Sequence, residues 1–116
     1  MRFEEFVDEQ VFSPVLIANA LRTTKSEIAG TLGLGKDAFT RKSRIRARKT
    51  QVRLRQMLEI LNRVEATTGS TLAAYAWFRG EPLSGFGGAT ADSLVRQGKA
   101  DHVHAYLDQV MAGGYA

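Results

Sequence analysis

The stretch TQVRLRQMLEILNRVEATTG, residues 50–69, is the strongest helix signal in the chain. Its apolar residues recur at steps of three and four, the spacing that gathers side chains on one face of an α-helix. They are Val52, Leu54, Met57, Leu58, Leu61 and Val64. Thr50 is a suitable cap at its start, and Gly69 is a suitable stop. We therefore expect one long helix here that serves as a scaffold for the other elements.

Cap signals upstream of this stretch predict shorter helices. Ser13 followed by Pro14 is a typical helix start. Thr24 and Glu27 have the spacing of a capping box, in which each side chain accepts the other's backbone amide, and Gly33 is a typical stop. The helices expected in this half cover residues 14–23, 25–32 and 36–46.

The helical pattern restarts downstream of the long helix. Ser70 and Thr90 are suitable caps, and Gly80 and Gly98 are suitable stops. The helices expected in this half lie within residues 70–80, 90–98 and 100–112, with a glycine-rich loop over residues 81–89. Since the sequence contains no convincing strand alternation, the predicted fold class is all-α.

Length and composition exclude several classes of protein. The chain has 116 residues, is 44% hydrophobic and contains no cysteine. This length provides one globular domain or two very small ones, which excludes a large two-domain catalyst. The lack of cysteine excludes disulfides, thiolate zinc sites and a cysteine nucleophile. The acidic start and short apolar runs predict a cytoplasmic protein without a membrane span. We divide it into residues 1–12, residues 13–68 and residues 69–116.

The charge of the chain is concentrated in one segment. Residues 36–55 hold nine basic residues and one acidic residue, whereas the segments before and after each carry a net charge of −2. So dense a cationic segment attracts polyanions, of which nucleic acid is the most common for a cytoplasmic protein. The alternative interpretation is a solvated, positively charged helix face.

The segment around residues 28–39 has the pattern of a helix-turn-helix unit. Ala29 is small enough for close helix approach, Gly33 suits the turn, and Phe39 packs the second helix. Lys42 stands where another apolar residue is usual, so Ile45 is expected to replace it in the core. The second helix of such a unit enters the DNA major groove. The residues predicted to bind DNA are Lys36, Thr40, Arg41, Lys42, Ser43, Arg44, Arg46, Arg48 and Lys49. A helix-turn-helix retained only as a scaffold is the alternative.

The C-terminal sequence AYAWFRGEPLSGFGGATADSLVRQGKADHVHAYLDQVMAGGYA, residues 74–116, carries a family resemblance. Together with the upstream helix-turn-helix and long helix, it resembles the Xre/MbcA/ParS family of antitoxins. The resemblance implies that the C-terminal domain binds a RES-domain toxin that degrades NAD, and that the tail covers the toxin's active-site entrance. It also implies repression of the shared operon by the N-terminal half. The residues assigned to toxin binding are Trp77, Arg79, Gly113, Gly114, Tyr115 and Ala116.

Little in the sequence supports a metal site, a phosphate-binding loop or a catalytic site. His102 and His104 are two positions apart, so on a helix they point away from each other and make a poor metal pair. No phosphate-binding loop or nucleophile with its base is present, so we expect no cofactor, no metal and no enzymatic activity. The alternatives to an antitoxin are a stand-alone helix-turn-helix regulator and a scaffold protein for polar localisation.

A homodimer is also expected, because helix-turn-helix proteins read two-fold operators as pairs. The apolar residues of the N-terminal segment are candidates for its interface. They are Phe3, Phe6, Val7, Val11 and Phe12.

Overall fold

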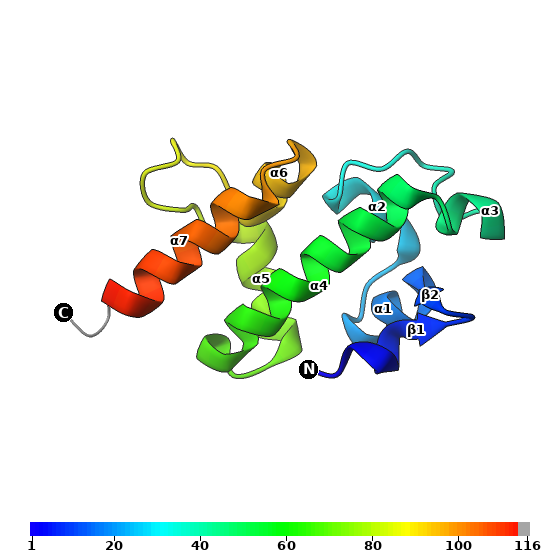
Figure 1. Cartoon of the computed structure of the whole chain (residues 1–116), viewed down its shortest axis with the longest axis horizontal. Helices are drawn as coiled ribbons and strands as arrows, with labels where there is room; N and C mark the ends of the chain where they lie inside the picture. Colours follow the sequence, from blue (N-terminus) through cyan, green and yellow to red (C-terminus); the bar gives the residue numbers. More distant parts are fainter. Residues whose placement is uncertain (114–116) are drawn as a thin grey trace.

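Seven α-helices, one short 3₁₀ helix and a small hairpin form the part of the chain that the computed structural model describes, residues 1–113 (Figure 1). The N-terminal half contains η1 (Phe3–Phe6), β1 (Val7–Asp8), β2 (Val11–Phe12), α1 (Pro14–Ala20), α2 (Lys25–Thr31) and α3 (Lys42–Ile45). It is followed by α4 (Arg48–Thr68), α5 (Thr71–Gly80), α6 (Ala91–Arg96) and α7 (Ala100–Gly113). The predominantly helical class predicted from the sequence is confirmed.

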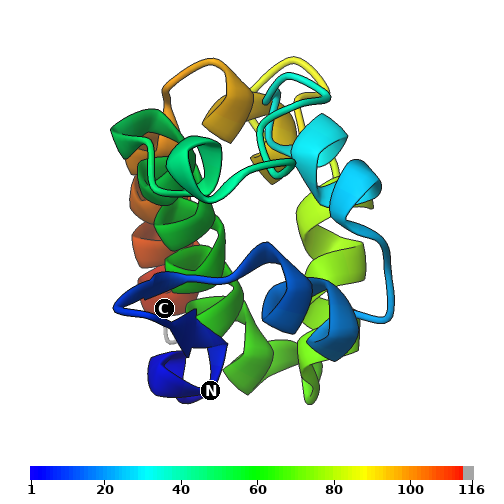
Figure 2. The same ribbon diagram turned by 90° about the vertical axis from the view of Figure 1, so that its right-hand side faces the viewer.

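The long helix α4 is the scaffold of the fold, as its sequence pattern predicted. It packs against β2 and α3 near its start, and against α5, α6 and α7 further along. In the end-on view of Figure 2, α4 lies on one side of the molecule and α1, α2 and α5 lie on the other. Ile60 is fully buried although it lies outside the predicted apolar stripe. Neighbours from both halves of the chain therefore cover more of α4 than one face.

The predicted start of the long helix was wrong by three residues. Ala47 is the N-cap residue and Arg48 begins the helix, while Thr50 is buried inside the first turn. The side chain of Gln51 fixes this geometry, because it accepts the Phe12 amide at 2.9 Å and donates to the Phe12 carbonyl at 3.0 Å. It also donates to the Ile45 carbonyl at 2.9 Å. The helix start is thus set by tertiary contacts rather than by a polar cap.

The predicted helix over residues 36–46 is also wrong for most of its length. Residues 36–41 form turns, and only Lys42–Ile45 are helical. The hydroxyl of Thr40 donates to the Asp37 carbonyl at 2.8 Å, a local bond that competes with helix formation. Phe39 remains buried, and Ile45 packs against the core as expected. The helix predicted as the second helix of a helix-turn-helix unit is therefore only about one turn long.

The hairpin was not predicted. Its antiparallel strands pair Val7 with Phe12 and Asp8 with Val11. Glu9 and Gln10 form the two-residue loop, with φ values of 50° and 71°. Such a loop suits the twist of a hairpin, although asparagine and glycine are the usual residues. Strands of two residues are too short to show alternation, and the loop lacks the usual turn residues, so no local pattern indicates this hairpin.

Side-chain caps start several helices as predicted. Ser13 accepts the Leu16 amide at 3.2 Å, and Ser70 accepts the Ala73 amide at 3.0 Å. Thr24 likewise accepts the Glu27 amide, but the Glu27 carboxylate accepts the Thr23 hydroxyl instead of completing the predicted capping box.

No helix within residues 1–113 has both the length and the apolar character needed to cross a membrane.

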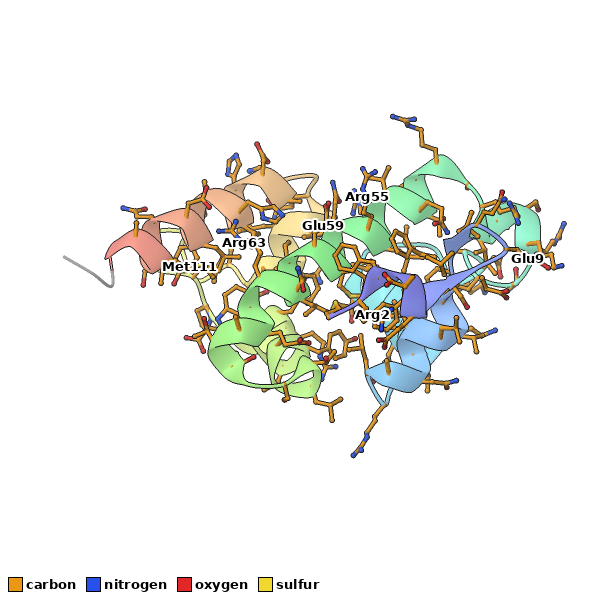
Figure 3. All side chains as sticks on the ribbon, turned by 60° about the horizontal axis from the view of Figure 1, so that its bottom comes forward. Arg2, Glu9, Arg55, Glu59, Arg63 and Met111 are labelled. Carbon is orange, nitrogen blue, oxygen red and sulfur yellow. The ribbon has the colours of Figure 1, made fainter. Side chains whose placement is uncertain are left out.

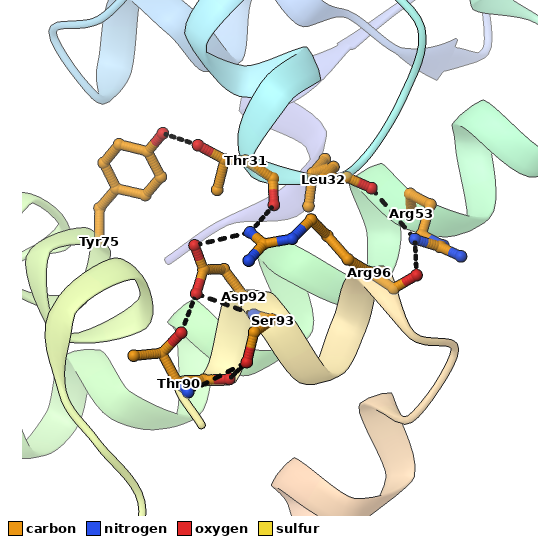
Figure 4. Close-up of polar contacts among 8 residues, drawn as sticks. All are labelled: Thr31, Leu32, Arg53, Tyr75, Thr90, Asp92, Ser93 and Arg96. Atoms are coloured by element: carbon orange, nitrogen blue, oxygen red, sulfur yellow. Dashed lines mark hydrogen bonds and ion pairs between the residues drawn. The ribbon is translucent and has the colours of Figure 1, made fainter. Parts of the chain in front are cut away.

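Two arginines join the halves of the molecule at the C-terminus of α2 (Figure 4). Arg96 of α6 donates to the Thr31 carbonyl at 3.0 Å and to the Asp92 carboxylate at 3.0 Å. Arg53 of α4 donates to the Leu32 carbonyl and to the Arg96 carbonyl, both at 3.1 Å. Cations suit the last carbonyls of a helix, which lack partners within the helix. We call these two side chains the arginine clasp.

Gly33 lies directly against the arginine clasp. Its φ of +68° is left-handed, and a Cβ atom there would lie 3.0 Å from Cγ of Arg96. We expect Gly33→Ala to destabilise the protein by about 1–2 kcal/mol, the cost of a left-handed conformation for an L-residue. Urea denaturation measures this loss.

Gly30→Ala is the matched control, because Gly30 lies in α2 with nothing within 4 Å of its added Cβ. It is expected to stabilise the protein by about 0.5–1 kcal/mol through helix propensity. A similar loss of stability in both variants would contradict the role given to Gly33.

Candidate functional sites

A basic surface covers one end of the molecule, where α3 lies in Figure 1. It consists of the turn before α3, α3 itself and the start of α4. The nine residues predicted to bind DNA all lie in this region, and all nine are exposed. The structure therefore brings the predicted set together, although on turns and helix ends rather than on one recognition helix.

The hairpin neutralises part of the basic surface. The Glu9 carboxylate forms ion pairs with Lys42 at 3.3 Å and with Arg46 at 3.6 Å. Arg46 also donates to the Glu9 carbonyl at 2.8 Å. The other five cations of the predicted set have no carboxylate of residues 1–113 within ion-pair distance. These are Lys36, Arg41, Arg44, Arg48 and Lys49.

A small apolar groove lies toward the opposite end of the molecule, between α4, α5 and α7. Its volume is about 110 Å³. The lining residues are Val64, Thr67, Thr68, Trp77, Tyr106, Leu107, Val110 and Met111. Trp77 is half-buried in its wall, and Val110 is 50% exposed at its edge. We call this the Trp77 groove.

The wall of the Trp77 groove is held by an arginine of α4. Arg63 donates to the Asp108 carboxylate at 2.6 Å and to the His104 carbonyl at 3.2 Å. It also approaches the Met111 sulfur at 3.8 Å, and Figure 3 shows Arg63 directed toward α7. Since this one side chain spans three successive turns of α7, it fixes the position of that helix on α4. His104 is therefore part of this contact, whereas His102 is exposed.

A carboxylate near the far end of α4 is tied to the start of α5. Glu65 accepts the Thr71 hydroxyl, and this hydrogen bond is the main reason that the pKa of Glu65 lies below its ordinary value. The nearby N-terminal ammonium of Met1 lowers the pKa further, while partial burial opposes both effects. A lowered pKa stabilises the fold at neutral pH, and this contribution disappears as the pH falls through the lowered value.

The residues predicted to bind toxin do not all fall in one place. Trp77 lines the groove, but Arg79 lies over the Tyr75 ring at 4.7 Å, on a different face of α5. The Tyr75 hydroxyl in turn faces Thr31 of α2 at 3.5 Å. Gly113 is the last residue of α7. The predicted contacts at Gly114, Tyr115 and Ala116 lie outside the described residues.

The sequence offered a signal for the groove residues that were not predicted as a site. Val110 and Met111 continue the apolar stripe of the last helix to its end. Only part of that stripe is covered, since Val103 and Leu107 are buried while Val110 is half exposed. An apolar stripe that runs past its covering helix is thus the feature that marks this surface.

Comparison with protein families identifies the segment that forms the Trp77 groove. Residues 63–113 match the family model described as the antitoxin Xre/MbcA/ParS C-terminal toxin-binding domain. These residues are thus similar to the toxin-binding domain of the Xre/MbcA/ParS antitoxins. All residues that line the Trp77 groove fall within the match, whereas the basic surface lies outside it. The resemblance seen in the C-terminal sequence is therefore confirmed, and it supports an antitoxin role with a toxin as partner.

No curated protein and no solved structure matched the chain in the other two comparisons. Within residues 1–113, no three His, Cys, Asp or Glu side chains are grouped so that they could hold a metal ion.

Proposed function

We propose that this protein is an antitoxin that neutralises a RES-domain, NAD-degrading toxin by binding it through the C-terminal domain. The family match over residues 63–113 is the observation that carries the proposal. The Trp77 groove supports it, because a concave apolar surface with a half-buried tryptophan is typical of an anchor site at an interface. In this proposal the protein acts by binding in the cytoplasm and performs no catalysis itself.

The test is purification of this protein together with the product of the adjacent gene, followed by an assay of NAD consumption. We expect a stable complex that consumes little NAD, and a free partner that consumes it rapidly. A partner that forms a complex but does not consume NAD would contradict the RES assignment while leaving an antitoxin role intact. Failure to form any complex would favour the alternative of a stand-alone regulator.

Occlusion of the toxin's active site is assigned to the last four residues. Tyr115 offers a large, rigid side chain with a polar tip, which suits insertion into a cleft. Deletion of residues 113–116 is expected to reduce inhibition of NAD consumption by at least about tenfold, the loss of roughly one anchor residue. Thermal unfolding of the free variant should change little.

Binding of the truncated variant to the toxin serves as its control, because the Trp77 groove is retained. If truncation leaves inhibition unchanged, then the groove alone accounts for neutralisation and the occlusion model is wrong. If truncation removes complex formation altogether, the tail supplies binding energy rather than occlusion alone.

The basic surface supports a second function, binding of operator DNA by a homodimer to repress the operon. Nine exposed residues on one surface, five of them cations without a carboxylate partner among residues 1–113, favour a polyanionic partner. Exposed Val7, Val15 and Leu16, at 39%, 48% and 37%, supply apolar area from the N-terminal half for the dimer interface.

Loss of two central cations tests the DNA function. Arg41→Ala combined with Arg44→Ala is expected to weaken binding to operator DNA about tenfold or more at low salt and to lower the log–log salt slope by about two. Fluorescence anisotropy across a salt series measures both quantities.

Arg79→Ala combined with Lys99→Ala removes the same charge from exposed residues outside the basic surface. This control should bind DNA nearly as tightly as the parent protein. Equal weakening by both double variants would show a general charge effect, and equal binding by all three proteins would remove the DNA function.

A further inference from the structure

A cavity of about 390 Å³ lies where the turn after α2 meets the first turn of α4. Gly35, Lys36 and Asp37 contribute to one wall, and Ala47, Lys49 and Thr50 contribute to the other. The cavity is thus part of the basic surface but is built by the start of the longest helix in the molecule.

The start of α4 carries unpaired backbone donors, and Lys49 and Thr50 of its first turn line this cavity. The first hydrogen bond of α4 runs from the Gln51 amide to the Ala47 carbonyl at 3.0 Å. The amides of Arg48, Lys49 and Thr50 therefore precede the helical ladder, and they have no acceptor among residues 1–113. Ala47 has no side chain that can cap them, in contrast to Ser13 and Ser70 at other helices.

The charges in the first turn of α4 are the opposite of those that stabilise a helix start. Acidic side chains are favourable there because the helix dipole is positive at that end. The first turn of α4 contains no acidic residue and begins with two cations, Arg48 and Lys49. A bound anion relieves both the unpaired amides and this charge repulsion.

Thr50 provides the second, independent observation. This residue is only 5% exposed and lines the cavity. Its hydroxyl forms no hydrogen bond with any residue in the described part of the chain, and it is not a buried unpaired atom of the kind found at Oε1 of Gln56, so solvent reaches this oxygen where Thr50 lines the cavity. A polar atom in this position suits an acceptor that enters the cavity from outside.

The charge of the cavity wall indicates which class of ligand fits the cavity. Lys36, Arg44 and Lys49 line it together with one carboxylate, Asp37, so the wall is cationic. Amides at a helix start and flanking cations are the groups that bind phosphate oxygens in proteins. The ligand class is therefore a phosphate group.

We propose that this cavity binds a backbone phosphate of nucleic acid, and that α4 rather than α3 anchors the duplex. The proposal rests on the DNA-binding function proposed above, and it specifies the contact. Because α3 is a single turn, phosphates and not base edges supply most of the interaction at this surface.

Ala47→Asp tests the site by placing a carboxylate at the N-cap, where it occupies the amides and repels phosphate. We expect a higher melting temperature because the helix gains a cap. We also expect roughly tenfold weaker binding of a short DNA duplex at low salt, with the salt slope reduced by about one. Ala66→Asp, on the exposed surface of the same helix, is the control of equal charge and should leave binding within about twofold of the parent.

Inorganic phosphate provides a second probe that needs no variant. In an NMR titration, phosphate should shift the amide signals of Arg48, Lys49 and Thr50 more than those of Gln51 and later residues. Such shifts without binding of the duplex would overturn nucleic acid as the source of the phosphate. No selective shift, or equal weakening by Ala47→Asp and Ala66→Asp, would overturn the site but leave DNA binding by the basic surface standing.

An absence of duplex binding by the parent protein would overturn the DNA function and the assignment of this cavity to nucleic acid. The proposed antitoxin function would be unaffected, since the toxin complex tests it separately.

Discussion

Val110→Glu should abolish the toxin complex while the free protein stays folded. Val110 is 50% exposed at the edge of the Trp77 groove, so a longer polar side chain can reach water in the free protein. In a complex, its carboxylate would be buried without a partner, at a cost of about 3–5 kcal/mol. This corresponds to a loss of affinity of roughly 100- to 1000-fold or more. Calorimetric titration of the toxin measures it.

Gln109→Glu is the matched control, because it adds the same charge one position earlier on an exposed part of α7. We expect this variant to bind toxin within about threefold of the parent protein, as surface substitutions outside an anchor site usually do. Circular dichroism should show equal helicity for both variants. Retained toxin binding by Val110→Glu would place the interface elsewhere on residues 63–113.

Phe78→Ala should cause the largest loss of stability among single substitutions in the C-terminal domain. Phe78 is fully buried on α5, the helix that packs most extensively on α4. Truncation of a buried phenylalanine costs about 3–5 kcal/mol through lost burial and the cavity left behind. If the total stability lies at the lower end of the usual range, at about 5 kcal/mol, this loss leaves a substantial unfolded population. Chemical denaturation measures the change.

Phe86→Ala removes the same atoms at a less buried position in the loop. Phe86 packs against the Tyr106 ring, with centroids 6.1 Å apart, but remains partly exposed. Its loss is expected to cost about 1 kcal/mol, in line with an aromatic pair at a partly exposed site. Equal losses in the two variants would show that the loop contributes to the core as much as α5 does.

The helices that the sequence predicted well are those whose ends are set locally. Ser13 and Ser70 cap helices because their hydroxyls accept amides three residues further on, which depends on nothing outside the segment. The start of α4 instead depends on Gln51 and its bonds to Phe12 and Ile45. Such contacts between distant segments have no signature in a local pattern.

The prediction of a helix over residues 36–46 was wrong for a related reason. Its composition permits a helix, but Thr40 and Asp37 form a local bond that holds a turn, and Phe39 must reach the core from that turn. Local hydrogen bonding of this kind competes with helix propensity, and propensity alone does not decide the outcome.

The two candidate sites also differ in how far they could be predicted from the sequence. Exposure of the basic surface followed from its charge density, because so many cations cannot be buried together. The apolar stripe of the last helix indicates an uncovered surface, but the Trp77 groove itself could not be predicted, since it exists only where α4 ends beneath the last turns of α7. The Glu9 ion pairs could not be predicted from the sequence either, because they depend on a hairpin whose strands are too short to show a pattern.

The arginine clasp also bears on how proteins of this kind are able to exchange parts during evolution. Arg53 precedes the family match and Arg96 lies within it, yet both hold the end of α2. A recombination event that joins this C-terminal domain to a foreign N-terminal half would separate Arg96 from the helix end that it holds. Inheritance of α2, α4 and α6 as one unit avoids that loss. New toxin specificity is therefore expected to arise by substitution on the outer surface of α7 more readily than by domain shuffling.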